Sequence, residues 1–178
     1  MKYFTRDLIE RYGALDDDAI SRAAEAEWEA TLARYEQQLR SIEPKLPEHI
    51  RAFTRLLLHD ALVLSIARQG DKLLMVLRKD IPPKDVVLLT YSLISEPVID
   101  REALSSEHNG RAMEYLYDEF ELVQDGHRQT YAQSILFGNG WELSLRFSDV
   151  HVNLADPLYP QPGTIFGPVS ASMPAPSA

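Results

Sequence analysis

A histidine next to an aspartate is the first pair of residues in this sequence that could do chemistry. His59 and Asp60 stand where a helix-like pattern gives way to a strand-like one. An imidazole beside a carboxylate can exchange protons near neutral pH or bind a metal ion. Metal-dependent phosphohydrolases use such a pair with an upstream histidine and a downstream aspartate in a helical bundle. His49 lies upstream, but strand-like residues follow, so the pattern favours a structural role in which His59 or Asp60 binds the end of the preceding helix.

A run of tyrosines and acidic residues from 115 to 121 is the second candidate group. Strand alternation groups Leu116, Asp118, Phe120 and Leu122 on one face, and Tyr115, Tyr117, Glu119 and Glu121 on the other. A core-facing carboxylate is costly unless it is paired. Asp118 could therefore bond a neighbouring strand or a histidine, act as an inward charge that discourages misassembly, or form part of a pocket, where burial would raise its pKa. The tyrosine and glutamate face could bind a partner, because tyrosines are enriched at interfaces.

Other chemical signals are weak. Asp149 and His151 share one strand face, but two ligands are too few for zinc, so we expect no metal and no cofactor. The chain has no cysteine, which excludes a thiol nucleophile and a thiolate metal site. It also lacks the nucleophile-elbow, phosphate-loop and dinucleotide-binding glycine motifs.

Helices are expected over residues 5–58. Thr5 can cap a helix that runs to about Tyr12 and ends at Gly13. Asp16–Asp18 then begins a long helix that ends before Pro44, and its apolar stripe is Ile20, Ala24, Trp28, Leu32, Tyr35, Leu39 and Ile42. A further helix starts near Pro47, with Ile50, Phe53 and Leu57 on one face.

Strands are expected over residues 60–154. Turn residues at Gly70, Gly126 and Asn139-Gly140 predict hairpins, and strands joined by short turns are antiparallel. In the first strand Leu62, Leu64 and Ile66 should share a face, and a change of parity predicts a bulge near Ser148-Asp149. Residues 97–110 are expected to be a polar connection. The fold class is therefore α+β, with N-terminal helices packed on an antiparallel, meander-type sheet of about six strands.

Composition and charge predict one domain over residues 1–155. Residues 156–178 hold six of the eleven prolines and are expected to be a partly disordered tail. The N-terminus shows no signal peptide and no apolar run approaches the roughly 18 residues of a membrane span, so we expect a cytoplasmic protein. The net charge is −9. No basic footprint is visible, which argues against nucleic acid and anionic membranes and favours a cationic or neutral partner.

Four motifs occur in order along the chain: the opening Met1–Thr5, the junction Leu58–Ala61, the run Leu116–Phe120 and the hairpin Ile135–Glu142. Together they resemble a family of uncharacterised bacterial proteins, a domain of unknown function with a MKYF start. The resemblance covers about residues 1–155. It implies a bacterial origin, no established activity and no catalytic residues to transfer. It marks His59, Asp60, Asp118 and Trp141 as the first positions to mutate.

The leading expectation is a non-enzymatic binding or interaction protein, immunity-like or regulatory, with a protein partner. The alternative is a small hydrolase with His59, Asp60 and Asp118 in one pocket, which requires these groups to lie within about 8 Å of one another. A structural subunit with an exposed apolar sheet face is the third possibility. The candidate binding or pocket residues are His59, Asp60, Tyr117, Asp118, Glu119 and Trp141.

Overall fold

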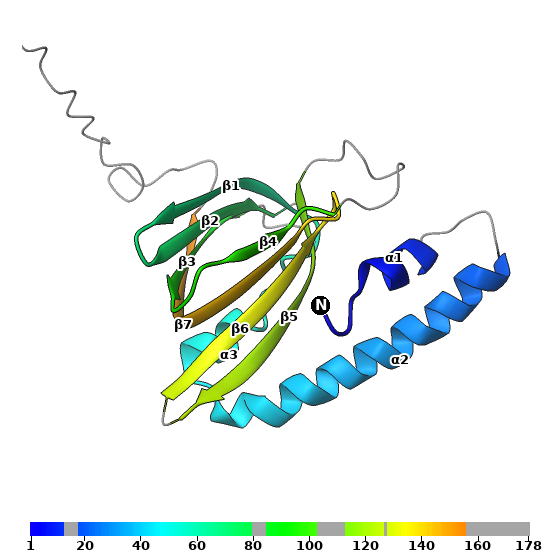
Figure 1. The fold of residues 1–178 in the computed structure, drawn as a ribbon, viewed down its shortest axis with the longest axis horizontal. Helices are drawn as coiled ribbons and strands as arrows, with labels where there is room; N and C mark the ends of the chain where they lie inside the picture. The colour runs from blue at the N-terminus through cyan, green and yellow to red at the C-terminus, as the bar shows by residue number, and fades with distance from the viewer. Residues whose placement is uncertain (13–17, 80–84, 103–112, 127, 156–178) are drawn as a thin grey trace, which may run out of the picture.

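Helices precede strands along the chain, as the periodicity predicts (Figure 1). The computed structural model describes residues 1–12, 18–79, 85–102, 113–126 and 128–155. The expected cap Gly13, the first two aspartates of the long helix and the proline-rich tail lie outside the described residues. The helices are α1 (Arg6–Tyr12), α2 (Asp18–Ile42), the 3-10 turn η1 (Glu43–Lys45) and α3 (Glu48–Phe53). The strands are β1 (Ala61–Gln69), β2 (Lys72–Arg78), β3 (Val86–Leu93), β4 (Val98–Asp100), β5 (Glu114–Asp125), β6 (Arg128–Phe137) and β7 (Glu142–Ala155). The α+β class is confirmed.

The sheet is antiparallel throughout and curves round on itself. Its strand order is β3-β2-β1-β5-β6-β7-β4, and β3 also pairs with β7. Two meanders, β1–β3 and β5–β7, are thus joined at both sides. At one side only Ala61 and Leu62 of β1 pair with β5. At the other side the whole length of β3 pairs with β7. The seventh strand is β4, inside the segment predicted to be a polar connection. It has three exposed residues, so no alternation of buried and exposed positions marks it in the sequence.

Three bulges decide which side chains face the core. The bulge predicted near Ser148 is confirmed, because Ser92 pairs with Asp149 while Leu93 pairs with Phe147. A bulge at Leu64 was not predicted. It leaves Leu64 48% exposed and makes the expected common face of Leu62, Leu64 and Ile66 wrong. Val63 and Ile66 pack on the core instead.

A third bulge lies at Leu116, between the paired positions Tyr115 and Tyr117. It turns Tyr115 to the core face, where its side chain is buried. The predicted grouping of Tyr115 with Tyr117 is therefore wrong, because the extra residue reverses the parity of the strand before it.

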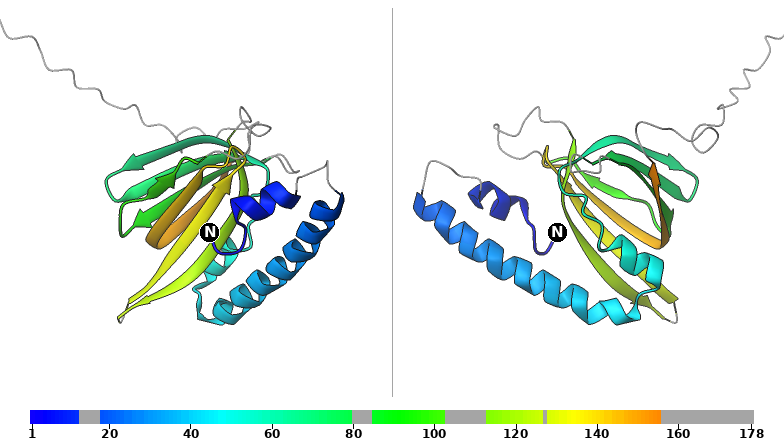
Figure 2. Two further views of the ribbon diagram at one scale, coloured as in Figure 1. Left: turned by 45° about the vertical axis from the view of Figure 1, so that its right-hand side comes forward. Right: turned by 180° about the vertical axis from the view of Figure 1, so that it is seen from behind.

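The helices lie on two sides of the curved sheet (Figure 2). The N-terminal segment and α1 lie between α2 and the strands, and the predicted cap is confirmed because Leu8 N–H donates to Thr5 Oγ1 at 3.3 Å. Helix α3 places Ile50 and Phe53 in the core. Leu57 does not join them, because α3 ends at Phe53 and Leu57 is 74% exposed.

Candidate functional site

His59 and Asp60 join the start of β1 to the bulge of β5. The His59 Nδ1 donates to the Leu116 carbonyl, and its ring lies 4.9 Å from the Tyr117 ring. Asp60 has a left-handed backbone with φ of 62°, which is uncommon outside glycine, and its N–H donates to the Tyr115 carbonyl at 2.9 Å. The predicted helix-end role is wrong, since α3 ends six residues before His59. Both side chains are exposed.

Asp118 points into the interior and belongs to a polar network with side chains of β3 and β6. Gln133 Nε2 donates to the Asp118 carboxylate at 2.8 Å and to the Tyr115 hydroxyl at 2.9 Å. The Tyr91 hydroxyl donates to Gln133 Oε1 at 2.9 Å. Burial raises the pKa of Asp118, although the hydrogen bonds from Gln133 and Tyr115 act in the opposite direction. Of the roles open to Asp118, a bond to the neighbouring strand is the one that forms.

The structure does not bring the hydrolase trio together. His59 packs against Tyr117, on the face of β5 opposite to Asp118. Neither of the two cavities described below is lined by His59, Asp60 or Asp118. Neither of these two cavities therefore provides the shared pocket that the hydrolase alternative predicts.

Tyr117 and Glu119 face outward, but the N-terminal segment covers them. The Glu119 carboxylate is buried and accepts backbone N–H groups of Lys2 at 2.7 Å, Tyr3 at 2.6 Å and Phe4 at 2.8 Å. The Phe4 ring stacks on Tyr117 with centroids 5.4 Å apart. The face that the sequence predicted for a partner is thus occupied by the chain itself, so a partner could reach it only by displacing this segment.

Trp141 stands at the tip of the β6–β7 hairpin. Its backbone N–H donates to Asn139 Oδ1 at 3.1 Å, which closes the predicted turn, and Gly140 there has a positive φ of 89°. The Arg101 guanidinium lies 5.1 Å from the Trp141 ring, within the range of a cation–π contact. The next residue, Glu142, lines the first cavity.

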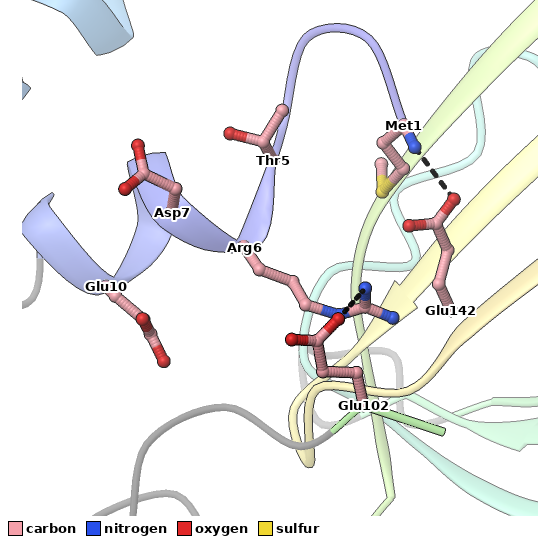
Figure 3. Close-up of a pocket in the computed structure, with 7 residues that line it drawn as sticks. All are labelled: Met1, Thr5, Arg6, Asp7, Glu10, Glu102 and Glu142. Carbon is pink, nitrogen blue, oxygen red and sulfur yellow. Dashed lines mark hydrogen bonds and ion pairs between the residues drawn. The ribbon is translucent and has the colours of Figure 1, made fainter. Parts of the chain in front are cut away.

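The first cavity opens between α1 and this hairpin and has a volume of about 410 Å³ (Figure 3). Four carboxylates and two cationic groups line it together with a hydroxyl: Met1, Thr5, Arg6, Asp7, Glu10, Glu102 and Glu142. The Met1 amino group forms an ion pair with Glu142 at 2.7 Å. This is a net acidic lining. Five of its members lie within residues 1–10, but no local pattern places Glu102 and Glu142 beside them.

Arg6 holds this cavity together. Its Nε donates to the Gly140 carbonyl at 2.7 Å, and its Nη1 donates to Asp100 at 2.9 Å and approaches Glu102 at 3.5 Å. The Glu102 N–H and the Arg6 guanidinium hold the pKa of Asp100 below its ordinary value. The guanidinium therefore fixes α1 to β4 and to the hairpin.

The second cavity, of about 270 Å³, lies between α3 and β7 and is lined by His49, Ala52, Phe53, Leu56, Val150, His151 and Val152. His49 Nε2 lies 2.7 Å from Asp149 Oδ1, and His151 Nε2 lies 3.4 Å from Asp149 Oδ2. Asp149 and His151 share a strand side, as predicted. The sequence also showed His49, but no local pattern placed it beside them.

Comparisons with known proteins give no family for this chain: no family model matches it, and no curated protein matches its sequence. The resemblance to the MKYF family stays a prediction carried by its four motifs. Within the described residues, no group of three or more His, Cys, Asp or Glu is placed to hold a metal ion. No described helix is long and apolar enough to cross a membrane.

Proposed function

We propose that this chain is a binding protein that recognises a positively charged segment of a protein partner in the first cavity. The observation that carries the proposal is the lining of that cavity, where four carboxylates face two cationic groups. A partner's lysine or arginine side chain would meet a negative potential at a concave surface. An immunity-like or regulatory role would use such a site.

The side chains that would meet the partner are open to solvent. Glu102 and Asp7 have side chains that are 74% and 77% exposed. Arg6 is only 19% exposed, and its hydrogen bonds to Gly140 and Asp100 hold it in the wall. Asp7 pairs with Arg11 at 3.0 Å and Glu102 lies 3.5 Å from Arg6, so a cation from outside would compete with exposed ion pairs, which are weak. Both residues can be changed with little effect on packing.

Binding of a fluorescein-labelled tetralysine peptide, followed by fluorescence anisotropy at low and high salt, tests the proposal. The double variant Asp7→Asn/Glu102→Gln should bind about fivefold more weakly at low salt, because each exposed ion pair contributes about 0.5 kcal/mol. The difference should shrink at high salt.

A matched control removes the same charge elsewhere. Glu29→Gln/Glu36→Gln changes two exposed residues of α2 that do not line the cavity, and it should bind the peptide within twofold of the unchanged chain, as only the net charge differs. If both double variants bind the peptide equally weakly, net charge alone explains the loss, and the proposal that the peptide binds in the first cavity is refuted. A partner captured from the native host should be lost with the cavity variant and retained with the control.

A further inference from the structure

The second cavity brings together two imidazoles and a carboxylate from elements about a hundred residues apart. His49 belongs to α3, and Asp149 and His151 belong to β7. The two rings stack with centroids 6.4 Å apart and an interplanar angle of 17°. Each Nε2 faces a different oxygen of Asp149, at 2.7 Å for His49 and 3.4 Å for His151. One carboxylate thus orients His49 by a hydrogen bond and lies beside His151, and both rings line the cavity.

The state of Asp149 decides which nitrogen of His49 is free. Partial burial acts to raise the pKa of Asp149, but hydrogen bonds from His49 and from the Val150 N–H outweigh it and leave the pKa below its ordinary value. An ionised carboxylate only accepts hydrogen bonds. His49 must therefore carry its proton on Nε2, and the neutral ring has its lone pair on Nδ1. Because the contact with Asp149 is made by Nε2, Nδ1 is the basic nitrogen of the neutral ring.

The other residues that line this cavity are apolar. Ala52, Phe53 and Leu56 of α3 face Val150 and Val152 of β7, and Phe53 and Val150 are buried in the core. An oriented base beside apolar lining residues suits a substrate that has a polar reacting group and a short hydrocarbon part.

We propose that His49 is a general base that hydrolyses small esters with an apolar acyl group, and that Asp149 is its positioning residue. Nδ1 of His49 takes a proton from water while the water oxygen forms a bond to the ester carbonyl carbon. The bond from that carbon to the alcohol oxygen then breaks, and the alcohol oxygen takes the proton from Nδ1. The products are the carboxylic acid and the alcohol, and the imidazole is restored. This activity would exist beside the binding function and uses a separate site.

Hydrolysis of 4-nitrophenyl butyrate by the full chain tests the inference. His49→Gln should lower kcat/KM roughly a hundredfold, the usual contribution of a general base. Asp149→Asn should lower it at least tenfold, because the ring loses its fixed tautomer. The loss in this variant should fall on kcat with KM unchanged, since the ester still meets the same apolar lining. A purely structural role of Asp149 would raise KM as well, because the lining of the cavity would then change.

Two further variants make the result decisive. Glu48→Gln changes an exposed residue of the same helix and should leave the rate unchanged. Ala52→Phe, which fills the cavity, should remove a preference for the butyrate over the acetate ester. The proposal is overturned if wild type and His49→Gln hydrolyse the ester equally fast while circular dichroism shows both folded. It is also overturned if the wild type has no preference for butyrate over acetate, because the apolar lining then does not bind the acyl chain.

Discussion

At the scale of single residues, Asp118 shows how an interior carboxylate is tolerated. It has no cationic partner among the described residues, and it is held by Gln133 and the Tyr115 hydroxyl. Gln133 is itself 2% exposed, and it links the β3 tyrosine Tyr91 to this group. Such a network supplies hydrogen-bond partners to the polar groups of Tyr91, Tyr115, Asp118 and Gln133, which explains why a carboxylate can lie in the interior.

Asp118 should make stability fall as pH rises. Because burial raises its pKa in the folded chain, the folded state binds more protons than the unfolded state above the ordinary aspartate pKa, and stability decreases with pH through that window. Asp118→Asn keeps an acceptor for Gln133 but removes the charge. The variant should therefore melt at a higher temperature than the wild type at pH 8, and the difference should shrink towards pH 4. A difference that does not change with pH would contradict this account.

At the scale of elements, one acidic side chain docks the whole N-terminal segment. Glu119 accepts three consecutive backbone N–H groups, and Phe4 enters an aromatic cluster with Trp28, Tyr35 and Tyr117. The N-terminal segment and α2 together cover the outer face of β5. The acidic and aromatic residues that suggested a partner surface thus serve an intramolecular interface, which has the same chemistry.

Glu119→Ala should destabilise the fold by about 3 kcal/mol, because it leaves N–H groups of Lys2, Tyr3 and Phe4 without their acceptor in a partly buried site. Urea denaturation measures this loss. Glu121→Gln is the control, since it removes only the ion pair with the exposed side chain of Lys2, and it should stay within about 0.5 kcal/mol of the wild type. Similar losses in both variants would show that the three backbone bonds add little.

At the scale of the whole molecule, the two meanders share one core. The Phe147 ring is fully buried and contacts Tyr91 of the first meander and Phe120 and Tyr131 of the second. Phe53 of α3 contacts Tyr91 and Phe120 as well. Neither meander can bury its inner face without the other, so we expect them to unfold together.

Phe147→Ala should therefore lower the free energy of unfolding by about 3–5 kcal/mol and shift one common transition. The two tryptophans lie in different parts of the fold, Trp28 in α2 and Trp141 in the β6–β7 hairpin. Urea titrations of Trp28→Phe and Trp141→Phe backgrounds should give equal shifts of midpoint. Unequal shifts would mean that α2 and the curved sheet unfold separately.

Sequence alone determined the local features. The spacing of apolar residues gave α2 and α3, the turn residues at Gly70, Gly126 and Asn139-Gly140 gave three hairpins, and Thr5 gave a helix cap. Each of these depends on residues a few positions apart, whose chemistry acts within one turn of helix or one hairpin. The bulge at Ser148 was predictable for the same reason, since a parity change is visible along one strand.

Tertiary structure alone decided the closure of the sheet and the composition of the two cavities. The bulges at Leu64 and Leu116 arise from how whole strands fit their partners, and the pairing of β3 with β7 joins residues about sixty positions apart. Packing of helices on distant strands likewise sets His49 of α3 beside Asp149 of β7 and Arg6 of α1 beside Asp100 of β4. Such contacts depend on cross-strand hydrogen bonds and core packing between distant segments. The periodicity of a sequence reflects only nearby residues, so it does not predict these contacts.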